Sequence, residues 1–384
     1  GLSSVAVVTC TAAFVFGMLL ALLGALKLKL AERLGIGEGR VGGLLGALSL
    51  ALIPMMLLSG LLIDVLGVRF VLVVGALLAA VAVFSLSLRR SYLATLGCVL
   101  VLGAGSACLS TASVVLMPLA FFGEHGLAAS VNLGYVFVAL GALMTPTLTD
   151  LLLRTLNFHK TLALLALVCL IPAVTALLFW PRDLVEPAEK ANVLEVFGKV
   201  PVVLAAVAFL FYAPLEFAVS TWGSTYLTVD QGYGEGRAAW IMTFFWLAFL
   251  VGRVLMTLLF HSQSLDPSRA PWVIFILTLA AAAMMGNLAG SGKPRSAAWG
   301  LILLGFALGP IFPTLVAVAL GAAPNAHGTA YGAMFAVGSL GSATLAPVLG
   351  LLARGKRVMR ALRLLAPLAL LLVVAVLALA VAAE

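Results

Sequence analysis

The stretch Gly60-Leu-Leu-Ile-Asp64-Val-Leu-Gly67-Val-Arg69 separates two long apolar runs of the sequence. Its glycines permit a tight reversal where two helices nearly touch, and Asp64 and Arg69 place opposite charges between the runs. Two interpretations fit this spacing. The stretch is either a short loop with solvated charges at a membrane surface, or a charged gate that holds one state of a moving helix bundle.

The composition on both sides of this stretch indicates a membrane protein. The chain has 384 residues, of which 64% are hydrophobic and only 9% are charged. A water-soluble protein of this size could not bury so much apolar surface. The 38 glycines suit close helix packing in lipid. Strand-like alternation, which would indicate an outer-membrane barrel, is absent from the sequence.

About 20 apolar residues form one transmembrane helix, so twelve helices with short loops use nearly the whole chain. We therefore expect an all-α membrane protein with twelve transmembrane helices in two pseudo-symmetric six-helix bundles. The predicted helices cover residues 5–26, 40–63, 69–88, 92–117, 127–152 and 160–180, and then 200–228, 237–260, 271–290, 297–321, 327–353 and 359–382.

The predicted bundles are residues 1–180 and 200–384. Between them, residues 181–199 form the longest polar stretch, whose prolines and charges indicate a linker on the membrane surface. One amphipathic turn is expected around residues 193–197.

The two halves resemble each other at a nearly constant offset. Gly60 near the end of the second helix corresponds to Gly252 near the end of the eighth, and Pro118 in the fourth corresponds to Pro313 in the tenth. Each pair alone is weak, but together they favour two parallel six-helix repeats.

Other classes of function find little support. The net charge of +8 is scattered over loops and helix ends, so lipid head groups explain it without a nucleic-acid partner. The four cysteines lie in apolar runs without metal-ligand spacing, and we expect no metal, no cofactor and no disulfide. Zinc-protease, nucleophile-elbow and phosphate-loop motifs are absent, so we do not expect an enzyme.

The Gly60–Arg69 stretch resembles the loop-two motif of the major facilitator superfamily. Gly60, Asp64, Gly67 and Arg69 match that motif, whereas Val65 and Val68 stand where a basic residue is usual. The resemblance implies a twelve-helix transporter of the plasma (inner) membrane with both termini and the 181–199 linker in the cytoplasm. It also implies rocking-bundle alternating access, with charges of this loop pairing with neighbouring helix ends in the outward-open state.

The distribution of charge disagrees with that orientation. More Lys and Arg residues lie in the odd-numbered loops than in the even-numbered ones. By the positive-inside rule the odd loops would then be cytoplasmic and both termini outside. The orientation that the resemblance implies is the one we expect, and the disagreement stands.

Several stretches are similar to the fucose–proton symporter branch and its glucose-transporting relatives. They are residues 108–113, 131–141, 215–227, 246–253 and 309–314. The similarity implies a monosaccharide-like solute and coupling to H⁺ or Na⁺. In that branch a helix-four carboxylate takes part in proton coupling, and here Ser110 occupies its place, which weakens the case for proton coupling.

Glu216 is the only acidic residue well inside a predicted helix. An unpaired carboxylate in the bilayer is costly, so it should face a partner or a water-filled space. It is the candidate for ion coupling and substrate binding; the alternative is a structural hydrogen bond near a kink after Pro214. Arg253 could either extend to the membrane surface or pair with a carboxylate across the bundle.

The remaining candidates are aromatic, amide and hydroxyl side chains that could stack on a sugar and bond its hydroxyl groups. The alternative is that they anchor helices at the interface or cross-link them. The predicted substrate-binding set is Asn132, Tyr135, Ser110, Thr111, Tyr212, Glu216, Trp222, Trp246, Tyr331 and Phe335. The predicted gating set is Gly60, Asp64, Gly67, Arg69, Gly252 and Arg253.

From these features we expect a secondary transporter of a small polar solute, a monosaccharide first, acting as a monomer in the bilayer. Two other functions stay open: an exporter of amphipathic compounds with the same fold, and a membrane sensor or scaffold that transports nothing. Substrate identity, coupling ion and direction of transport do not follow from the sequence.

Overall fold

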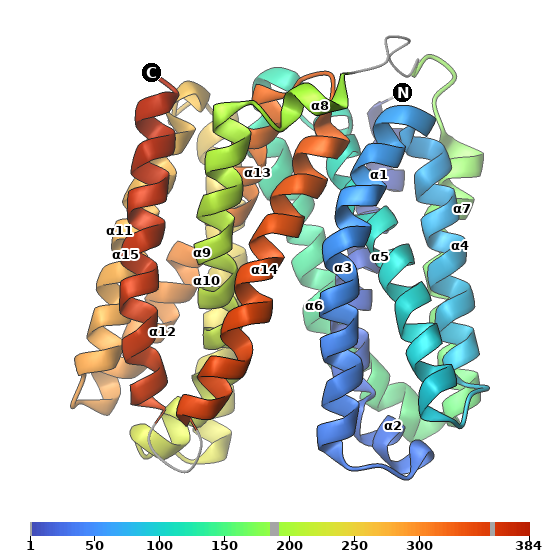
Figure 1. Cartoon of the computed structure of the whole chain (residues 1–384), viewed down its shortest axis with the longest axis horizontal. Coiled ribbons are helices and arrows are strands. Elements are labelled where there is room, and N and C mark those ends of the chain that lie inside the picture. The colour runs from blue at the N-terminus through green and yellow to red at the C-terminus, as the bar shows by residue number, and fades with distance from the viewer. Residues whose placement is uncertain (1, 185–191, 354–357) are drawn as a thin grey trace. The chain divides into compact units, whose positions relative to one another are not determined.

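The computed structural model describes residues 2–184, 192–353 and 358–384 of the chain (Figure 1). The described residues form helices and no strand. In chain order the elements are α1 (Leu2–Ala25), α2 (Lys27–Leu34), α3 (Glu38–Leu66), α4 (Val68–Leu86), α5 (Tyr92–Ala120), η1 (Glu124–Gly126), α6 (Leu127–Thr155), α7 (Phe158–Phe179), α8 (Val193–Val196), α9 (Val200–Thr225), η2 (Tyr226–Asp230), α10 (Glu235–His261), η3 (Pro267–Arg269), α11 (Ala270–Gly290), α12 (Pro294–Leu308), α13 (Ile311–Ala322), α14 (His327–Ala353) and α15 (Met359–Ala382).

Twelve helical segments of the described residues are long and apolar enough to cross a membrane. This confirms the predicted all-α, twelve-helix fold of an integral, multi-pass membrane protein. The boundaries agree with the predicted ranges to within a few residues, and α8 lies where one amphipathic turn was expected. Residues 185–191 of the predicted linker lie outside the described residues.

Almost all of the Gly60–Arg69 stretch is helical, and it does not form a loop. Helix α3 continues through Asp64 to Leu66, and α4 begins at Val68, so the reversal is made by Gly67 alone. Gly67 has a φ of +96°, a backbone conformation that a side chain would strain. Asp64 therefore lies in the last turn of α3 and not in a solvated loop.

The tenth span is interrupted, which the sequence interpretation did not anticipate. It consists of α12 and α13, and Gly309 and Pro310 lie between them. Pro310 and Pro313 have no N–H, so the carbonyls four residues earlier lose their usual helical donors. In a membrane these carbonyls need other partners, because lipid supplies none.

The described helices pack as two compact units. The first unit contains residues 1–124, 134–196 and 324–336, and the second contains residues 125–133, 197–323 and 337–384. Helices α6 and α14 contribute to both units. The predicted division into bundles 1–180 and 200–384 stays a prediction.

Each unit is built around one deeply buried span. In the first unit it is α5, which packs against α1, α3 and α4; in the second it is α12–α13, which packs against α9, α10 and α11. The buried share of the most hydropathic window is 72% for α5 and 78% for α12–α13. These are the fourth and tenth spans, so the most buried helices correspond to each other in the two predicted repeats.

Candidate functional site

In the first unit, Asp64 caps the N-terminus of α14. The backbone N–H of Gly328 donates to its Oδ1 at 3.3 Å, and the N–H of Thr329 donates to its Oδ2 at 2.8 Å. The Thr329 hydroxyl also donates to Oδ2. The first N–H groups of a helix have no partner within it, and its N-terminus favours a negative charge. Asp64 thus supplies from α3 the cap that α14 needs.

Glycines let the two helix backbones approach at this place. A Cβ atom on Gly60 would collide with the carbonyl of Gly328, and a Cβ on Gly332 would collide with the carbonyl of Met56. Gly328 and Gly332 have the small-xxx-small spacing that permits close helix contact in membranes. We call Gly60, Asp64, Gly328, Thr329 and Gly332 the α3–α14 contact.

The other predicted gating residues lie elsewhere. The Arg69 guanidinium lies 5.8 Å from the ring centroid of Trp180. Gly252 lies in the second unit, where a Cβ would come within 2.6 Å of the Phe306 carbonyl of α12. Gly60 and Gly252 therefore occupy corresponding places in the sequence but approach different elements. None of these observations tests a gating role.

Three predicted substrate-binding residues of the first unit form a chain of hydroxyl groups. Ser110 Oγ of α5 lies 2.7 Å from Tyr331 Oη of α14, which lies 2.7 Å from Tyr135 Oη of α6. All three side chains are buried, and the half-buried ring of Phe335 lies 5.9 Å from that of Tyr331. The structure thus brings these four predicted residues together.

Thr111 is adjacent in sequence but makes a different contact. Its hydroxyl lies 2.8 Å from that of Ser59 and donates to the Ala107 carbonyl at 3.0 Å. The bond to Ser59 joins α5 to α3, as expected of the cross-linking alternative, whereas the bond to Ala107 lies within α5. Whether Thr111 also contacts a substrate stays a prediction.

In the second unit, two predicted residues supply the donors that the interrupted span lacks. The Arg253 Nε–H of α10 donates to the Gly309 carbonyl at 2.8 Å, in place of the N–H that Pro313 does not have. The Tyr212 hydroxyl of α9 donates to the Leu308 carbonyl at 2.8 Å. Both side chains are buried, with exposed fractions of 0% for Tyr212 and 4% for Arg253.

Glu216 joins these two residues into what we call the Glu216 network (Tyr212, Glu216 and Arg253). Its carboxyl group lies beside the Tyr212 hydroxyl, and Arg253 attracts it electrostatically. Pairing of this kind offsets the cost of placing charge inside a membrane. The Tyr212 ring stacks on Phe312 at an interplanar angle of 10°, and the Arg253 guanidinium lies 4.3 Å from the ring centroid of Phe249.

Three further predicted residues lie in the second unit. The buried Asn132 amide donates to the Ala128 carbonyl at 2.8 Å and to the Thr314 hydroxyl at 3.0 Å. Within the described part of the chain its Oδ1 has no hydrogen-bond partner. Trp222 and Trp246 are half-buried, and Trp246 meets the rings of Phe245 and Phe249 edge-on.

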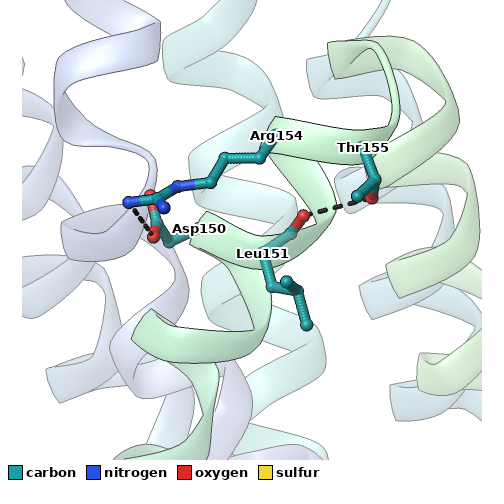
Figure 2. A network of polar contacts seen from close by, with 4 residues as sticks. All are labelled: Asp150, Leu151, Arg154 and Thr155. Carbon is teal, nitrogen blue, oxygen red and sulfur yellow. Dashed lines mark hydrogen bonds and ion pairs between the residues drawn. The ribbon is translucent and has the colours of Figure 1, made fainter.

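A carboxylate near the end of α6 provides a contrast to Glu216. Asp150 pairs with Arg154 one turn further along the helix, with Oδ2 and Nη2 3.1 Å apart (Figure 2). Their side chains are 64% and 75% exposed, and an exposed pair of this kind contributes about 0–1 kcal/mol. Asp150 is thus an exposed helix-end residue.

The sequence analysis did not identify the hydrogen-bond partners of Asp64, Tyr212 and Arg253. Thr329 and the carbonyls of Leu308 and Gly309 were not among the predicted site residues. The Gly328–Gly332 spacing could have indicated close packing of α14. Nothing in the sequence shows that Asp64 is the residue that caps the start of α14.

Comparison with known proteins agrees with this architecture. A family model described as Major Facilitator Superfamily matches residues 5–347. No curated protein matches the chain. Two similar solved structures, an outward-conformation crystal structure of the major facilitator transporter FucP and a point variant of the E. coli fucose:proton symporter FucP, each have a TM-score of 0.75 and 19% identity, with 96% of this chain and 97% of that chain covered.

A third similar structure is that of the human organic anion transporter MFSD10 (TETRAN). Its TM-score is 0.75 and its identity is 17%, with 98% of both chains covered. At these identities the three structures show a shared fold.

Proposed function

This chain belongs to the major facilitator superfamily, and we propose that it carries a small polar organic solute, a monosaccharide first, across the plasma membrane by rocking-bundle alternating access. Members of the family are membrane transporters, and the structure of the fucose:proton symporter shares the fold. The observation that carries the proposal is the Glu216 network inside the second unit.

The network supports ion coupling because its hydrogen bonds depend on whether Glu216 carries a proton. The Tyr212 hydroxyl has a single hydrogen, which it donates to the Leu308 carbonyl. An ionised Glu216 competes for that hydrogen, whereas a protonated Glu216 donates its own to the Tyr212 oxygen. Protonation at Glu216 would therefore change the bond that satisfies the interrupted tenth span. Na⁺ at the same carboxylate is the alternative coupling ion.

The polar and aromatic groups of both units support a polyhydroxylated solute. The first unit presents the Ser110–Tyr331–Tyr135 hydroxyl chain beside Phe335, and the second presents the Asn132 amide. Hydroxyl and amide groups exchange hydrogen bonds with sugar hydroxyls, while aromatic faces stack on the C–H surface of a sugar ring.

The α3–α14 contact supports a gating role for Gly60 and Asp64. Helix α14 contributes its first residues to the first unit and the remainder to the second. A change of state that withdraws the start of α14 must break three hydrogen bonds to one carboxylate. Asp64 would thus stabilise one conformational state over another.

An organic anion is the second candidate solute. The Arg253 guanidinium and the surrounding rings of Phe249, Tyr212 and Phe312 could pair with an anionic, partly apolar molecule. The organic anion transporter with the same fold adds to this alternative.

A solute screen distinguishes the two candidates. We expect monosaccharides, at concentrations far above their dissociation constant, to raise the melting temperature of the purified protein by a few degrees, because ligand binding stabilises the folded state. Lipophilic organic anions and cations should leave it unchanged, and uptake of the active sugar into proteoliposomes should follow. Stabilisation and uptake confined to amphipathic ions would overturn the sugar assignment.

Membrane orientation needs its own test. We propose that both termini and the 181–199 linker are cytoplasmic. In a variant without native cysteines, a cysteine replacing Asp183 should react with a membrane-impermeant maleimide only when the cytoplasmic face is accessible. A cysteine replacing Arg295, which lies an odd number of spans away, should react only from outside. The reverse pattern would establish the orientation that the positive-inside rule favours.

A further inference from the structure

The first residue of α14 is a buried histidine, His327, which lies in the first unit beside the α3–α14 contact. The two residues that follow it, Gly328 and Thr329, donate their backbone N–H groups to Asp64. Histidine is the side chain whose ordinary pKa, about 6.5, places its change of charge between pH 5 and 8. A histidine at this place can therefore make the contact depend on pH.

Two carboxylates face His327 from two different elements. Its Nε2 lies 3.5 Å from Glu124 Oε2 of η1, and at the end of α3 it attracts Asp64 electrostatically. The first turn of α14 itself contains no acidic residue. The His327 side chain is 9% exposed and that of Glu124 is 53% exposed. The histidine thus lies between one carboxylate that caps α14 and another that remains in contact with water.

The charges around His327 determine the direction of the effect. The N-terminus of a helix carries roughly half an elementary positive charge, which opposes a cation there. Two ionised carboxylates supply two full negative charges and outweigh that opposition. Burial also disfavours a charged imidazole, but the half-exposed Glu124 limits this cost, and solvent screens a buried ion pair only weakly.

We propose that protonation of His327 strengthens the α3–α14 contact. The protonated side chain bridges Asp64 and Glu124 and holds the start of α14 on the first unit, whereas the neutral side chain leaves only the Asp64 cap. The added stability is present in acid and is lost as the pH rises, because the closed contact binds the proton more tightly than the open one. This property of the contact does not depend on the proposed solute or gating role, although its effect on transport does.

Hydrogen exchange of the full chain in detergent measures the contact without measuring transport. Overlapping peptides that isolate the amides of Gly328 and Thr329 report how often their bonds to Asp64 open. After correction for the pH dependence of chemical exchange itself, these amides should be about fivefold or more better protected at pH 5.5 than at pH 8, the lower end of typical coupling between two binding events. Equal protection at the two pH values, or better protection at pH 8, would overturn the proposal.

Three variants assign the effect to this histidine. His327→Gln keeps a polar side chain that does not titrate, and it should lose the difference between the two pH values. Glu124→Gln changes a half-exposed residue without disturbing the core, and it should reduce the difference. The control His159→Gln removes an exposed histidine of the same unit that bonds to Ser87, and it should retain the full difference.

Retention of the full difference by either His327→Gln or Glu124→Gln would also overturn the proposal. Because the measurement involves no transport, its failure is distinguishable from failure of the proposed function, which uptake measurements test separately.

Discussion

Replacing Glu216 with glutamine should abolish accumulation of substrate against a concentration gradient. Glutamine keeps the size of the side chain and can still bond to Tyr212, but it neither gains nor loses a proton and no longer attracts Arg253. Coupling requires a group that changes its charge or protonation during the cycle. We expect proteoliposomes with an imposed ion gradient to reach only the equilibrium distribution of substrate, whereas the unchanged protein concentrates it.

Exchange measurements show whether such a variant still binds and moves its substrate. Counterflow of labelled substrate needs no ion gradient, so Glu216→Gln should retain it at a reduced rate. The matched control is Asp150→Asn, which neutralises an exposed carboxylate that pairs with Arg154 on its own helix (Figure 2). That control should accumulate substrate normally. If Glu216→Gln also accumulates substrate as the unchanged protein does, Glu216 is not the coupling residue.

Replacing Asp64 with asparagine should slow transport about tenfold and leave substrate affinity nearly unchanged. Hydrogen bonds to a charged group contribute roughly 1.5–3 kcal/mol each, and asparagine retains only one acceptor oxygen for the two donors of Thr329 and the N–H of Gly328. It also removes the negative charge that the N-terminus of α14 favours. Initial uptake rates and the melting-temperature shift produced by substrate would measure the two effects separately.

A substitution at Gly60, which alters the close backbone approach of the two helices, tests the α3–α14 contact independently of Asp64. Gly60→Ala puts a methyl group against the Gly328 carbonyl, so α3 and α14 must separate, and transport should again slow. Gly46→Ala is the control on the same helix, because a Cβ there meets open space. It should leave transport unchanged and stabilise α3 by about 0.5–1 kcal/mol. Normal rates in both Asp64→Asn and Gly60→Ala would leave the contact with a purely structural role.

The outcome at Asp64 shows how far sequence reasoning could reach. The spacing of glycines and charges indicated a reversal between the second and third spans, and Gly67 makes that reversal. That spacing did not indicate that α3 continues past Asp64. The helix can continue because one residue with positive φ, Gly67, suffices to turn the chain. The partner of Asp64 lies 265 residues away at Thr329, a separation that no local pattern encodes.

The Glu216 network shows the same limit for the candidate site. Glu216, Tyr212 and Arg253 were recognisable as polar groups in apolar surroundings, since the bilayer makes such residues rare. The bonds of Tyr212 and Arg253 to the interrupted tenth span were not recognisable. They depend on Pro313, which leaves the Gly309 carbonyl without its usual donor, on the break between α12 and α13 beside Leu308, and on the packing of α9 and α10 against these helices.

The sequence by itself determined that the chain crosses the membrane twelve times, because spanning depends on the length and hydropathy of contiguous residues. It also determined which few polar side chains lie inside the spans. Only the tertiary structure decided what those side chains bond to. Lipid supplies no hydrogen-bond partners, so a buried polar group is stabilised by donors and acceptors of the protein, and helix packing brings such partners from segments that lie far apart in the sequence.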